Sequence, residues 1–123
     1  MNTLITNAVV LTLNDRLDVV QGAAGIVDGR IVFVGDVPAA YGGVRFDETI
    51  DAEGGYLLPG FVQTHIHLCQ TVFRTLADDL PLLDWLRTRV WPLEAAHDPA
   101  TLAVSARLAA AELLKGGTTT ALT

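Results

Sequence analysis

The stretch LPGFVQTHIHLCQ, residues 58–70, separates two parts of the chain that differ in character. After a proline and a glycine it continues as a short apolar run, and it carries His65 and His67 with Ile66 between them. We expect FVQTHIH to form a buried strand. Because side chains alternate between the two faces of a strand, both imidazoles would point to one side and Ile66 to the other. The sequence therefore predicts two potential metal ligands on one face.

The part before this stretch is rich in β-forming residues. The runs VVQGAAGIV and RIVFVG flank Asp28-Gly29, a dipeptide that accepts the positive φ angles of a tight hairpin. Further strands are expected in TLITNAVVLTL and in RFDETIDA. These runs are short, glycine-punctuated and without helical periodicity, so residues 1–57 are predicted to form antiparallel strands of a small β-sandwich or barrel.

The part after this stretch alternates between helical and extended patterns. DPATLAVSARLAAAELLKGG has Asp98 as a suitable N-cap, Pro99 at the first helical position and Lys115 in the last turn before two glycines. A helix is also expected in DDLPLLDWLRTRVWPLEAAH, and TTTALT is extended. The order strand, helices, strand predicts the start of a parallel α/β arrangement. Residues 60–123 suffice for about one and a half to two βα units of ~30 residues each, whereas a closed barrel takes roughly 250 residues.

Composition excludes several kinds of partner. The net charge of −6 comes without a basic patch, which argues against a nucleic-acid polymer. No window reaches the ~18 to 20 apolar residues of a membrane helix, and the N-terminus has no targeting pattern, so we expect a cytoplasmic chain without a membrane partner. Cys69 is the single cysteine, which excludes an intrachain disulfide and predicts a small buried hydrophobe.

The segment PGFVQTHIHLCQTVFRTLADDLPLLDWL, followed by WPLE, resembles the opening of the amidohydrolase superfamily. The similar branch holds aminohydrolases and chlorohydrolases, including deaminases of adenosine derivatives, guanine deaminase and s-triazine hydrolases. H-x-H alone is a weak pattern, but P-G-F-V-x-T-H-x-H is specific in this setting. The resemblance implies that residues 1–57 are the N-terminal part of a β-sandwich domain. It also implies that residues 58–123 are the first βα units of a (β/α)8 TIM-type barrel that is incomplete in this chain.

The resemblance also implies one divalent metal ion, with His65 and His67 as its first two ligands. Zinc is the first expectation and iron the alternative. The remaining ligands and a proton-shuttling glutamate are expected beyond residue 123, so no catalytic acid or base is assigned within this chain. In such enzymes the metal lowers the pKa of its water towards ~7, hydroxide attacks a ring carbon that bears an amino group, and ammonia leaves.

Two residues are candidates for substrate binding. Glu94 in WPLE matches a glutamate that takes ribose hydroxyls in the similar adenosine-derivative deaminases, and Gln70 matches a position that can contact the heterocycle. From the residues alone, Glu94 could instead be a solvated acid at a helix end. Trp85 and Trp91 could line a pocket for a flat ring or simply pack. His97 is predicted to be a solvated histidine at a helix boundary rather than a ligand.

The loop after the histidine pair departs from the similar family at one point. Relatives commonly read Arg-Gly where this chain reads Arg74-Thr75, so the local backbone is expected to differ. Asp78 and Asp79 resemble family positions, but no chemistry is assigned to them.

Together these patterns predict the N-terminal portion of a metal-dependent hydrolytic deaminase that acts on a purine nucleoside derivative such as a 5′-modified adenosine. The expected partner is a small purine or related heterocycle, and the full-length protein is expected to be a homo-oligomer. Guanine deaminase or an s-triazine amino- or chlorohydrolase is the alternative among enzymes. A non-catalytic truncated product, or a subunit of a split assembly, is the alternative of another class. The chain alone is expected to be inactive and to associate through exposed apolar faces.

Overall fold

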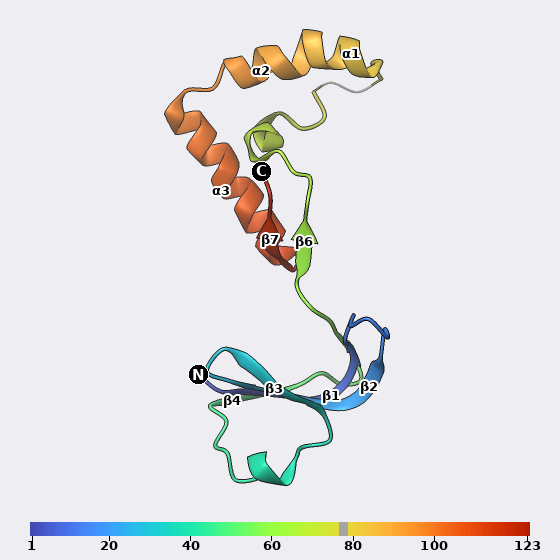
Figure 1. Ribbon diagram of the computed structural model, residues 1–123. Helices are drawn as coiled ribbons and strands as arrows, with labels where there is room; N and C mark the ends of the chain where they lie inside the picture. The colour runs from blue at the N-terminus through green and yellow to red at the C-terminus, as the bar shows by residue number, and fades with distance from the viewer. Residues whose placement is uncertain (77–78) are drawn as a thin grey trace. The chain divides into compact units, whose positions relative to one another are not determined.

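The computed structural model describes residues 1–76 and 79–123, and the chain forms two compact units, residues 1–59 and 60–123 (Figure 1). Asp78 lies outside the described residues. The assignment of residues 1–57 to a sandwich domain and of 58–123 to a barrel domain stays a prediction. Among the described residues, no helix is both long and apolar enough to cross a membrane.

The first unit is built on one five-stranded sheet. Four strands follow the order β3-β2-β1-β4, and β5 also pairs with β1. A short 3-10 turn, η1, follows β3. The elements are β1 Thr3–Leu11, β2 Val19–Val27, β3 Arg30–Gly35, η1 Ala39–Tyr41, β4 Glu48–Asp51 and β5 Tyr56–Leu57.

The hairpin that the sequence predicts at Asp28-Gly29 is confirmed. These two residues have φ angles of 50° and 74°, and β2 and β3 pair in antiparallel fashion on either side of them. The expectation of antiparallel pairing throughout was wrong, since β4 and β5 both run parallel to β1. They share one edge of β1, with β4 along its first half and β5 along its second. Asn7, at φ 53°, lies between the two halves, where the register of β1 shifts.

The second unit contains a parallel strand pair with helices between its two strands, as the sequence predicts. Figure 1 shows β6 and β7 side by side, with α3 leading directly into β7. A 3-10 segment, η2, follows β6, and a π-helical turn, η3, joins α1 to α2. The elements are β6 Phe61–Gln63, η2 Leu68–Phe73, α1 Leu82–Trp85, η3 Leu86–Val90, α2 Trp91–Ala95, α3 Pro99–Lys115 and β7 Thr118–Ala121.

Helix α3 begins and ends where its sequence predicts. The Asp98 carboxylate accepts from the Thr101 backbone N–H at 2.7 Å, and the Thr101 hydroxyl accepts from the Asp98 N–H at 3.0 Å. This reciprocal capping box satisfies two donors at the helix start. At the other end Gly117 adopts φ 83°, a conformation that glycine reaches without steric cost.

The predicted buried strand FVQTHIH is shorter and more exposed than expected. β6 ends at Gln63, so His65 and His67 lie beyond the strand. Its length is set by its pairing with β7, which runs from Phe61 to Gln63. Phe61 and Val62 are 51% and 64% exposed, because a parallel strand becomes buried only when layers cover both of its faces.

Candidate metal centre and substrate cavity

His65 and His67 converge just past the carboxyl end of β6. Their Nε2 atoms are 3.1 Å apart, and their rings meet edge to face with centroids separated by 5.0 Å. The backbone between them is irregular, so the alternation of a strand does not produce this convergence. Both side chains are exposed. The two imidazoles therefore point to one place, as the sequence predicts, but an irregular segment brings them together and not a strand.

The spacing of the two imidazoles fits a shared metal ion. Two nitrogens at 2.0 to 2.1 Å from one ion, with ligand angles near 90° to 110°, lie about 2.8 to 3.4 Å apart. The observed 3.1 Å falls in this range, and both atoms are Nε2, a usual ligand atom of histidine. In the described ranges 1–76 and 79–123, no third histidine, cysteine, aspartate or glutamate joins the pair in a cluster able to hold an ion.

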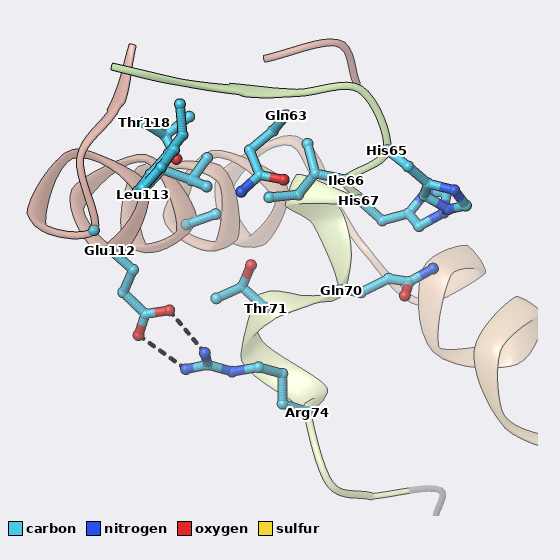
Figure 2. Close-up of a pocket in the computed structure, with 13 residues that line it drawn as sticks. Gln63, His65, Ile66, His67, Gln70, Thr71, Arg74, Glu112, Leu113 and Thr118 are labelled. Atoms are coloured by element: carbon cyan, nitrogen blue, oxygen red, sulfur yellow. Dashed lines mark hydrogen bonds and ion pairs between the residues drawn. The ribbon is translucent and has the colours of Figure 1, made fainter. Parts of the chain in front are cut away.

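The imidazole pair borders two hollows of the second unit. The larger, of about 660 Å³, opens towards α3 and β7. Figure 2 shows it with the two rings close together at one end and the Gln70 side chain beside them. The smaller, of about 350 Å³, lies towards the helix from α1 to α2, and its lining includes Gln70 and Glu94. All four candidate site residues thus border this smaller hollow, which we call the substrate cavity.

Glu94 is held by two neighbours from η2. Its Oε1 accepts from the Gln70 amide Nε2 at 2.8 Å and from the Cys69 thiol at 3.4 Å. Burial raises the pKa of the Cys69 thiol, and the Glu94 carboxylate beside it raises that pKa further. Glu94 is half-buried, so it is not the fully solvated acid at a helix end that the sequence left open as the alternative. The side chain of Gln70 bonds to Glu94 and is therefore oriented by it.

The carbonyl groups of η2 are fixed by two residues that sequence reasoning did not place there. Ser105 of α3 is fully buried, and its hydroxyl lies 2.8 Å from the Leu68 carbonyl and 3.0 Å from the Cys69 carbonyl. His97 Nε2 lies 2.8 Å from the same Cys69 oxygen. His97 occupies the helix boundary as predicted, but it is half-buried rather than solvated because its ring anchors this backbone.

A bidentate ion pair ties the far end of η2 to α3. The Arg74 guanidinium donates to both carboxylate oxygens of Glu112, at 2.7 and 2.9 Å, as Figure 2 shows. The adjoining carboxylate raises the pKa of Arg74. The sequence contains no local signal for this contact, because the two residues are 38 positions apart. With Ser105 and His97, the pair holds the segment that carries Cys69 and Gln70.

Trp85 and Trp91 both line the substrate cavity. Trp85 is half-buried, and Trp91 is 50% exposed. Leu82, Leu86 and Val90 contribute the apolar remainder of the wall. The cavity therefore combines flat aromatic and aliphatic surface with a carboxylate and an imidazole pair, a lining typical of small-molecule sites.

The second unit is thus a parallel α/β unit with a histidine pair just beyond its first strand. The chain belongs to the amidohydrolase family, which matches residues 56–123. Enzymes of this family are metal-dependent.

Two curated relatives indicate the branch of the family. The chain is 40% identical over 116 residues to a 5′-deoxyadenosine deaminase of Methanococcoides burtonii, covering 94% of this chain and 26% of the relative. It is 42% identical over 120 residues to a 5-methylthioadenosine/S-adenosylhomocysteine deaminase of Desulforudis audaxviator, covering 98% of this chain and 27% of the relative. The chain thus spans about a quarter of the length of these relatives.

Solved structures of two enzymes are similar over nearly the whole chain. An adenosine deaminase from Xanthomonas campestris with bound zinc has a TM-score of 0.80 and 38% identity, over 97% of this chain and 28% of that one. A triazine hydrolase from Arthobacter aurescens has a TM-score of 0.79 and 27% identity, over 98% of this chain and 28% of that one. The resemblance to deaminases and triazine hydrolases stated from the sequence is confirmed.

Proposed function

We propose that this chain is the N-terminal portion of a metal-dependent deaminase that converts a 5′-modified adenosine to the inosine analogue and releases ammonia. The observation that carries the proposal is the grouping of His65, His67, Gln70 and Glu94 around one cavity. The 40% and 42% identity to deaminases of adenosine derivatives supports this substrate class. Residues 58–123 would form the first βα units of the (β/α)8 barrel, and residues 1–57 part of a β-sandwich.

His65 and His67 would supply two imidazole ligands through Nε2. A divalent ion, zinc in the first place, would supply a water of lowered pKa next to the cavity. The 3.1 Å separation of the two nitrogens supports a shared ion. For ligation both Nε2 atoms must be free of protons, which leaves each ring proton on Nδ1.

Glu94 would bind the ribose of the substrate. A carboxylate is an acceptor with two oxygens, which suits two vicinal hydroxyl groups. Gln70 and Cys69 both donate to Oε1, so Oε2 makes no hydrogen bond with these two neighbours. The flat faces of Trp85 and Trp91 would flank the purine in the same cavity. Gln70 would orient the Glu94 carboxylate through its hydrogen bond. Its side chain would also contact the heterocycle of the substrate.

The 123-residue chain alone is expected to have no deaminase activity. The family resemblance assigns the remaining ligands and the proton-shuttling glutamate to positions beyond residue 123. Release of ammonia from 5′-deoxyadenosine by the purified chain would contradict this expectation.

The ribose role is tested with Glu94→Gln in the complete enzyme. The amide keeps the shape of the carboxylate but removes its charge and one acceptor, so we expect kcat/KM for adenosine derivatives to fall about 100-fold, with little change for free bases. Glu48→Gln, on an exposed strand of the first unit, is the matched control. Equal losses for nucleosides and free bases, or no loss for either, would remove the ribose role.

A further inference from the structure

The helix that carries Glu94 is not a regular α-helix. α1, η3 and α2 follow one another without a break, and Figure 1 shows them as one continuous helix. Within η3 the Trp91 N–H donates to the carbonyl of Leu86, five residues earlier. This hydrogen bond defines a π-helical turn, which holds one residue more than an α-helical turn and occurs frequently at functional sites.

Two residues explain why the turn forms at this place. Pro92 has no N–H, and in a regular α-helix its ring would collide with the carbonyl of Thr88, four residues earlier. The Thr88 hydroxyl donates to the carbonyl of Asp84 at 2.7 Å, a bond that tends to bend helices. Both effects favour a wider turn between α1 and α2.

The extra residue changes which side chains share a face. The helix lines the substrate cavity at every fourth position with Leu82, Leu86, Val90 and Glu94. In a regular α-helix each residue turns by about 100°, so Glu94 would point about 120° away from Leu82. The one additional residue of the π-turn takes back about 100° and leaves the two side chains only about 20° apart.

We propose that the π-turn Leu86–Val90 is a positioning element that turns Glu94 into the substrate cavity and thereby sets the preference for nucleosides. The inference rests on the proposed ribose role of Glu94. Its geometric part stands on the contacts of the carboxylate, which reaches Gln70 at 2.8 Å and Cys69 at 3.4 Å. A regular helix through the same residues would carry the carboxylate out of reach of both.

The direction of position 94 is measured by cross-linking. Cys69 is the only cysteine of this chain, so Glu94→Cys creates a single thiol pair that a short bis-maleimide can join through two thioether bonds. In this background, deletion of Thr88 combined with Pro92→Ala removes the extra residue and yields a regular helix whose position 94 still faces Cys69. Insertion of one alanine after Thr88, with Pro92 kept so that the π-turn persists, turns position 94 away by about 100°.

We expect the deletion variant to cross-link within about threefold of the parent rate, and the insertion variant to lose at least about tenfold. A variant with Leu93→Cys in place of Glu94→Cys is the control that distinguishes rotation of the helix from unfolding. The insertion moves residue 93 into the former direction of residue 94, so this variant should gain cross-linking. Equal losses for deletion and insertion, equal retention in both, or no gain at position 93 would overturn the inference.

The cross-link does not depend on activity, so it separates the two proposals. In the complete enzyme, the insertion should reduce kcat/KM for nucleosides more than for free bases, and the deletion should largely restore it. If the cross-links follow the helix phase but the substrate preference does not, the ribose role of Glu94 fails and the positioning role of the turn remains. If the cross-links do not follow it, the positioning role fails whatever the substrate.

Discussion

His65 and His67 show how much a single-residue pattern can predict. The H-x-H spacing and its apolar lead-in identified the pair, but the expectation relied on strand alternation, and β6 ends before either histidine. The bond between Gln70 and Glu94 could not be predicted, because the residues are 24 positions apart and neither pattern refers to the other. Candidate site residues could therefore be predicted from residue type and spacing, whereas their hydrogen-bond partners are known only from the folded structure.

Thr75 is a residue at which the sequence raised a doubt about the backbone. It stands where the similar family commonly has glycine, and it adopts φ 66°, a conformation that β-branched residues rarely reach. We expect Thr75→Gly to raise the free energy of unfolding by about 1 kcal/mol, since the relief of strain exceeds the entropy that glycine loses on folding. Urea unfolding followed by circular dichroism measures the change.

Thr75→Ala is the control for this substitution, because alanine lacks the β-branch but keeps a Cβ. Its free energy of unfolding should lie between those of the parent and the glycine variant. A glycine variant less stable than the parent would show that Thr75 is not strained.

α3 was predicted nearly to the residue because each of its ends has a local signal. Asp98, Pro99 and the two glycines act within one turn of the helix they delimit. The parallel pairing of β4 and β5 with β1 has no local signal, since hairpin patterns reveal only neighbours in sequence. The π-turn of η3 was also missed, because apolar spacing in that segment fits an ordinary helix well enough.

The N-terminus of α3 should make stability depend on acid pH. Hydrogen bonds from the backbone N–H and the hydroxyl of Thr101 hold the pKa of the Asp98 carboxyl below its usual value. A carboxyl with a depressed folded-state pKa contributes its full stabilisation above the unfolded-state value, and this contribution is lost as the pH falls through the folded-state pKa. Asp98→Asn keeps a capping oxygen but has no charge to titrate.

We therefore expect Asp98→Asn to be less stable than the parent at pH 7 and to approach it below about pH 3. Urea unfolding of both variants at a series of pH values measures the difference. A constant gap between Asp98→Asn and the parent across the series would show that the cap acts without its charge.

At the scale of the whole chain, α3 is apolar on more than the face it buries. Ser105 and Ala109 are buried, whereas Leu102, Val104 and Leu114 are 44%, 57% and 71% exposed. A helix that is apolar on all sides normally lies inside a larger body. The chain spans about a quarter of the length of the curated relatives, which agrees with a helix that packs against further polypeptide.

We expect the 123-residue chain to associate at micromolar concentration, because exposed apolar patches of this kind bury themselves against other copies. Multi-angle light scattering should give a mass well above 13.1 kDa. The double variant Val104→Lys and Leu114→Lys places charge on the exposed faces of α3, where lysine keeps helix propensity, and should shift the mass towards the monomer. Arg107→Lys, an exposed substitution on the same helix that preserves charge, should not. A monomeric parent chain, or lysine variants as associated as the parent, would show that α3 needs no further cover.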